Sequence, residues 1–139
     1  MIKYNNYVNG QFLTPSSTQK RPTVNVKKGN YTLIMYDPDA PNGFVHWAAN
    51  INDNVITDII PYMGPSPPKG ETHRYMFYLY PQKQIKLSRV GKIQKGTPIQ
   101  TVFFTSKNTS AGTRRRRKRN TRLRYSLVTR FTAKSSFAS

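Results

Sequence analysis

The sequence predicts a mainly β protein followed by a strongly basic extension. Aromatic residues are plentiful, with 9 Tyr, 7 Phe and 1 Trp, while 8 Gly and 10 Pro interrupt the 139-residue chain. This composition favours short strands joined by turns over long helices. Because a chain of this length is long enough for one hydrophobic core and too short for two ordinary ones, we expect one globular domain.

Charge divides the chain into two parts. The net charge is +18. Residues 107–139 contain 11 Lys and Arg and no acid, whereas residues 1–106 contain 12 basic and 5 acidic residues, a balance of 12 − 5 = +7. We therefore predict a mildly basic domain over residues 1–106 and an Arg-rich C-terminal extension over residues 107–139.

The predicted elements are short runs of β-forming residues between turns. Residues 10–26 are expected to be extended at the edge of a sheet, because Pro15 and Pro22 lack the N–H group that a central strand donates. Residues 31–36, bounded by Pro38, are expected to form a buried strand. Further strands are predicted over residues 45–51, 72–80 and 99–104.

Alternation along each predicted strand indicates which side chains share a face. In the second strand, Val45 and Trp47 are expected on one face and His46 on the opposite face. In the third strand, His73 and Tyr75 are expected side by side on one face. An imidazole and a phenol are therefore predicted to emerge together near the start of that strand.

Polar side chains with binding chemistry are concentrated in the middle of the chain. All five acids lie between positions 37 and 71, and both histidines, His46 and His73, lie in or next to this region. Imidazole, phenol and backbone N–H groups can donate several hydrogen bonds to a phosphate. Since Asp37 and Asp39 would repel an anion, we expect them to orient a histidine and raise its pKa, or to meet an ammonium group.

The same residues are open to other interpretations. Asp-Pro-Asp-Ala-Pro alone is typical of a turn, and Arg74 is expected to be an ion-pair partner of a scarce acid. Asp with two His residues suits a divalent metal or acid–base catalysis. However, the sequence has no nucleophile elbow and no His-Glu-x-x-His motif. We therefore expect a protein that is not an enzyme and that needs no cofactor or metal.

Several motifs, taken in order, resemble the phosphatidylethanolamine-binding protein family, also called the Raf kinase inhibitor protein family. They extend over about residues 10–104. The motifs are Leu13-Thr14-Pro15, Thr18-Gln19, Arg21-Pro22-Thr23-Val24, Tyr31-Thr32-Leu33-Ile34-Met35, Asp37-Pro38-Asp39-Ala40-Pro41, Val45-His46-Trp47, Gly64-Pro65, Pro67-Pro68-Lys69-Gly70 and His73-Arg74-Tyr75.

The resemblance implies an antiparallel Greek-key β-sandwich with a small pocket for phosphate or a phosphorylated lipid head group. Carried over by motif, the pocket residues are Asp37, Asp39, His46, Pro68, His73 and Tyr75. It also implies a cis peptide bond between Ala40 and Pro41. Two departures stand out: the segment between Tyr80 and Pro98 is short and basic, and the Arg-rich extension replaces the C-terminal helix of animal members.

The composition of the C-terminal extension predicts a second binding site, for a polyanion. Its six consecutive basic residues are Arg114, Arg115, Arg116, Arg117, Lys118 and Arg119. Such a run suits a polyanion, whether nucleic acid, an anionic membrane or an acidic protein surface. A solvated tail without a partner is the plain alternative.

The absence of cysteine excludes disulfides and thiolate zinc sites. We expect a cytoplasmic protein that is not secreted, since no signal-like or membrane-spanning apolar stretch occurs. The preferred function is a non-enzymatic binding module that acts as an inhibitor or regulator. The alternative is a structural protein of a larger assembly, for example a large DNA virus particle, in which the fold is a scaffold and the extension provides attachment or nucleic-acid contact.

Overall fold

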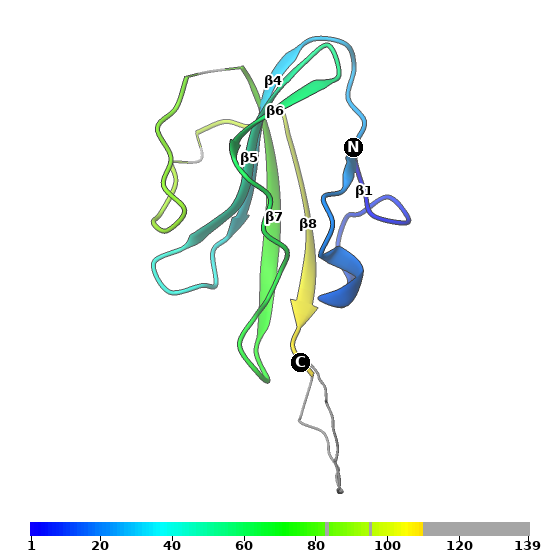
Figure 1. Cartoon of the computed structure of the whole chain (residues 1–139), viewed down its shortest axis with the longest axis vertical. Coiled ribbons are helices and arrows are strands. Elements are labelled where there is room, and N and C mark those ends of the chain that lie inside the picture. Colours follow the sequence, from blue (N-terminus) through cyan, green and yellow to red (C-terminus); the bar gives the residue numbers. More distant parts are fainter. Residues whose placement is uncertain (83, 95, 110–139) are drawn as a thin grey trace, which may run out of the picture. The chain divides into compact units, whose positions relative to one another are not determined.

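The computed structural model describes residues 1–82, 84–94 and 96–109, and it confirms a mainly β fold (Figure 1). The described residues contain one 3-10 turn over Ser16–Thr18, no α-helix and no helix able to cross a membrane. The strands are β1 (Ile2–Lys3), β2 (Gln11–Phe12), β3 (Thr23–Val24), β4 (Asn30–Asp37), β5 (Phe44–Asn52), β6 (Val55–Ile60), β7 (Thr72–Pro81) and β8 (Gln100–Lys107). The basic run Arg114–Arg119 lies outside the described residues.

Six strands form one sheet in the order β2-β8-β7-β4-β5-β6, and β1 pairs with β3 separately. Neighbours in the large sheet are antiparallel except for the short edge strand β2, which runs parallel to β8. β4, β5 and β6 follow one another directly, and β7 returns to pair with the other side of β4 (Figure 1). The sheet is therefore mixed rather than wholly antiparallel, and a two-sheet Greek-key sandwich stays a prediction.

Both faces of the large sheet carry an apolar cluster. One face is covered by the N-terminal segment, and its buried residues include Ile2, Val8, Leu33, Met35, Trp47, Tyr75, Phe77 and Phe104. The other face is covered by the segment that follows β7, and its residues include Ile34, Tyr36, Val45, Tyr78, Tyr80, Ile85, Leu87 and Ile93. Since central strands are buried on both sides, β4 has a continuous apolar run instead of strict alternation.

A β-bulge in β5 changes the faces that its residues occupy. Met35 pairs with Trp47 and Tyr36 pairs with Val45, so His46 is an extra residue with no partner position on β4. As a result Trp47 belongs to one apolar cluster and Val45 to the other. The prediction that Val45 and Trp47 share a face is wrong, because a bulge shifts the alternation by one residue.

The loop after β4 turns without the cis peptide bond that the resemblance implied. No peptide bond among the described residues is cis, so the prediction for Ala40-Pro41 is wrong. The chain instead turns through positive φ angles of 61° at Asn42 and 78° at Gly43. A Cβ atom at Gly43 would collide with the Tyr36 hydroxyl, which is why this position requires glycine.

Candidate functional site

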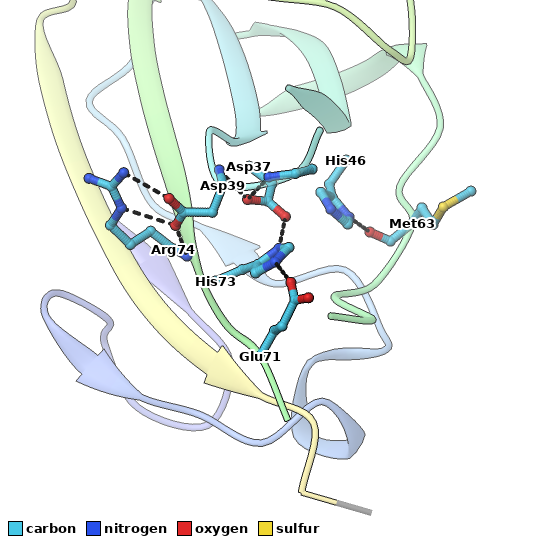
Figure 2. Close-up of polar contacts among 8 residues, drawn as sticks. Asp37, Asp39, His46, Met63, Glu71, His73 and Arg74 are labelled. Atoms are coloured by element: carbon cyan, nitrogen blue, oxygen red, sulfur yellow. Dashed lines mark hydrogen bonds and ion pairs between the residues drawn. The ribbon is translucent and has the colours of Figure 1, made fainter. Parts of the chain in front are cut away.

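Asp37, the last residue of β4, is the centre of a buried polar cluster (Figure 2). Its Oδ1 accepts hydrogen bonds from the N–H groups of Asp39 at 2.8 Å and Ala40 at 3.2 Å. Its Oδ2 lies 2.7 Å from Nδ1 of His73. Asp37 is 2% exposed and His73 is 4% exposed. One buried carboxylate therefore holds the turn and orients an imidazole from the neighbouring strand.

His73 lies between two carboxylates. Its Nε2 is 3.0 Å from Oε1 of Glu71, while its Nδ1 faces Asp37. Because carboxylate oxygens only accept hydrogen bonds, this geometry favours the imidazolium, in which both ring nitrogens donate. Burial lowers the pKa of His73, but the hydrogen bonds and charges of Asp37 and Glu71 outweigh burial and raise the pKa above its ordinary value. The structure thus shows the expected orientation of a histidine by an aspartate.

His46 lies beside this cluster, and its surroundings favour the neutral ring, in contrast to those of His73. Its ring packs edge-on against Tyr75, with the ring centroids 5.2 Å apart. Its Nδ1 lies 2.7 Å from the carbonyl oxygen of Met63, so Nδ1 carries the proton and donates it (Figure 2). Burial lowers the pKa of His46. The neutral ring therefore has Nε2 as a hydrogen-bond acceptor.

Tyr75 is adjacent to both imidazoles. Its ring centroid lies 6.5 Å from that of His73 and 5.2 Å from that of His46, and the ring stacks on Phe104. Burial, together with the nearby charge of Asp37, raises the pKa of Tyr75. The phenol therefore keeps its proton at neutral pH and is a hydrogen-bond donor.

Arg89 supports the bulge that carries His46. Its Nη1 donates to the carbonyl oxygens of Val45 and His46, both at 3.0 Å, and its Nη2 donates to that of Pro61 at 2.9 Å. Its guanidinium also lies over the Phe44 ring. A bulge disrupts the hydrogen-bond ladder, so these donors satisfy carbonyl groups there. This role of Arg89 was not predicted, because an isolated arginine in a basic loop gives no signal.

Asp39 and Pro68 are not part of the histidine cluster itself. The Asp39 carboxylate accepts hydrogen bonds from the Arg74 backbone N–H, Nε and Nη2 at 2.8, 3.1 and 2.9 Å. This ion pair confirms the expectation for Arg74 and lowers the pKa of Asp39. Pro68 is exposed, and its carbonyl accepts the N–H of Glu71 at 2.9 Å. Both residues therefore hold the loops around the cluster.

The cluster combines three complementary groups. His73 supplies a cationic donor, Tyr75 a neutral donor and His46 a neutral acceptor. Such a set matches a protonated phosphoryl group, whose oxygens accept hydrogen bonds while its O–H donates one. No group of three or more His, Asp or Glu side chains in the described part of the chain is placed to hold a metal ion.

Comparison with known families agrees with the motifs. The family model described as phosphatidylethanolamine-binding protein matches residues 6–120, which include every residue of the histidine cluster. The chain therefore belongs to the phosphatidylethanolamine-binding protein family.

Three similar proteins come from rice, tomato and yeast. Protein MOTHER of FT and TFL1 homolog 2 from Oryza sativa subsp. japonica is 38% identical, over 54% of this chain and 51% of the rice protein. Protein SELF-PRUNING from Solanum lycopersicum is 28% identical, over 82% of this chain and 83% of the tomato protein. Carboxypeptidase Y inhibitor from Saccharomyces cerevisiae is 33% identical, over 52% of this chain and 50% of the yeast protein. The chain thus spans about half the length of the rice and yeast relatives that it matches.

Proposed function

We propose that this protein is a non-enzymatic binding module for a phosphate monoanion or a phosphorylated head group, held between His46, His73 and Tyr75. The observation that carries the proposal is the meeting of a cationic imidazole and a neutral imidazole around one phenol. Asp37, one of the five acids of the chain, accepts a hydrogen bond from Nδ1 of His73 and so favours the protonated imidazole. A regulatory role follows from the family, since the yeast relative is named an inhibitor.

The protonation state of His46 makes the proposal specific. Burial lowers the pKa of His46 and favours the neutral ring, and with Nδ1 donating to Met63, Nε2 of this neutral ring can accept a hydrogen bond but cannot give one. A phosphate monoester has its second pKa near about 6 and so keeps an O–H group in mildly acidic solution. Sulfate has no proton to donate at this pH. His46 therefore distinguishes a protonated phosphoryl group from a fully deprotonated anion of similar size.

Phosphate is expected to bind roughly 5- to 150-fold more tightly than sulfate at pH 6, because sulfate leaves Nε2 of His46 unsatisfied at a cost of about 1–3 kcal/mol. The measurement is a titration with each anion, followed by NMR of the histidine side chains. A His46→Phe variant keeps a ring against Tyr75 but removes the acceptor, so it is expected to lose the preference.

Equal affinities for phosphate and sulfate would contradict the role of His46. Unchanged histidine signals throughout the phosphate titration would contradict the binding function itself. That second result would favour the other candidate function, a structural protein whose fold is a scaffold and whose basic extension makes the attachment or nucleic-acid contact. The observation behind this candidate is the concentration of 11 of the 23 Lys and Arg residues in residues 107–139.

A further inference from the structure

Glu71 is the accessible one of the two carboxylates that contact His73. The Glu71 side chain is 59% exposed, whereas those of Asp37 and His73 are 3% and 5% exposed. In Figure 2 Glu71 approaches the imidazole from the side opposite Asp37. It thus occupies Nε2, the ring nitrogen through which His73 would reach a ligand.

The backbone of Glu71 is fixed although its side chain is exposed. Its N–H donates to the Pro68 carbonyl at 2.9 Å, and its own carbonyl accepts the Asn108 N–H at 3.4 Å. Glu71 directly precedes β7, and its carboxylate reaches the imidazole of His73 two residues further along the chain. Rotation of the side chain is therefore enough to bring the carboxylate onto Nε2 or to take it away.

The two carboxylates differ in how easily they can leave the imidazole. Asp37 also holds the N–H groups of Asp39 and Ala40, so its removal would leave buried donors unsatisfied. The Glu71 carboxylate is exposed, and an ion pair in contact with water contributes little. An anion that arrives at His73 would therefore displace Glu71 and leave Asp37 in place.

We propose that Glu71 is an internal anion that occupies His73 in the ligand-free protein and sets the affinity of the site for phosphoryl groups. This inference rests on the proposed function. If Glu71 stayed in place, a bound phosphate would add a third negative group around one imidazolium. Binding therefore requires an exchange of carboxylate for phosphate at Nε2, and weak or poorly matched anions fail to displace Glu71.

The test compares phosphate affinities at pH 6 and low salt for the full chain and its variants. Glu71→Ala is expected to bind phosphate roughly fivefold more tightly than the wild type, because the competing exposed carboxylate is gone. Glu71→Gln is expected to fall between them, since the amide oxygen still accepts from Nε2 but carries no charge. Asp53→Asn is the matched control, because it removes one charge at a turn residue whose φ of 47° also suits asparagine.

The phosphate affinity of Asp53→Asn is expected to stay within about twofold of the wild-type affinity, because salt screens the effect of one distant exposed charge. If Glu71→Ala binds phosphate as tightly as the wild type, the inference is overturned. It is also overturned if the variant binds more weakly, because Glu71 would then merely position His73. In both cases the phosphate-binding function itself would remain. An equal gain in Asp53→Asn would also overturn it, by showing a net-charge effect. If neither the wild type nor any variant binds phosphate, the proposed function fails and the inference fails with it.

Discussion

Replacing Asp37 with alanine is expected to lower the free energy of unfolding by roughly 3–5 kcal/mol, the cost of removing one partner from a buried ion pair. The carboxylate is 2% exposed and pairs with His73. The change also leaves the N–H groups of Asp39 and Ala40 without their acceptor. The measurement is urea unfolding of the wild type and the variant.

The loss in Asp37→Ala is expected to be larger at pH 6 than at pH 8. His73 has a raised pKa in the folded protein, so its contribution is full below its unfolded pKa of 6.5 and is lost as the pH rises through the folded value. The groups that face this ring are Asp37, Glu71 and Tyr75. Burial is the larger cause of the lowered pKa of His46, and the charge of His73 in turn helps to lower it. The part of the loss due to the turn N–H groups remains at both pH values.

Asp39→Ala is the matched control for Asp37→Ala. Its carboxylate pairs with Arg74 at the surface, where the Arg74 side chain is 56% exposed, and such a pair contributes about 0–1 kcal/mol. If the two alanine variants unfold at the same urea concentration, Asp37 is not the centre of the cluster.

Replacing Arg89 with alanine is expected to lower the free energy of unfolding by roughly 2–3 kcal/mol and to weaken phosphate binding. The guanidinium donates to the carbonyl oxygens of Val45, His46 and Pro61, which would lose a charged donor together. Because Val45 and His46 form the bulge, the His46 ring would also lose its fixed position beside Tyr75. Urea unfolding and a phosphate titration measure the two effects.

Arg89→Lys separates geometry from charge. A lysine keeps the positive charge but cannot reach three carbonyl groups with a rigid fork, so it is expected to resemble alanine more than arginine. Arg74→Ala is the control for loss of an arginine at an exposed ion pair. Wild-type stability and affinity in both Arg89 variants would show that the bulge does not depend on this side chain.

The sequence predicted the strands that carry several buried residues and missed β6, which is mostly exposed. The runs over residues 31–36 and 72–80 correspond closely to β4 and β7. β6 was not predicted, because only Ile60 of its six residues is buried and the exposed strand lacks a clear apolar face. The turn before it, with positive φ at Asp53 and Asn54, is a hairpin signal that was available in the sequence.

The main residues of the candidate site were predictable from the sequence, but their arrangement in space was not. The family motifs led to Asp37, His46, His73 and Tyr75, which the structure brings together. Strict alternation predicted His46 on the face opposite Trp47. The bulge at His46 depends on pairing with β4, and nothing local in the sequence marks it.

Glu71 was missed for a different reason. It belongs to no family motif, although its spacing of two residues from His73 in an extended segment is a signal that could have found it. Asp39 shows the opposite case, since it belongs to a motif but pairs with Arg74 instead of an imidazole. Long-range pairing decides both outcomes, and a single sequence does not specify that pairing.

The most direct measurement is NMR of the four imidazole nitrogens between pH 5 and pH 9. His46 is expected to stay neutral with its proton on Nδ1 at neutral pH, and His73 is expected to lose its second proton only above pH 6.5. Added phosphate is expected to shift Nε2 of both rings. Two imidazoles that titrate together near pH 6.5 and ignore phosphate would show that the cluster does not form the proposed site.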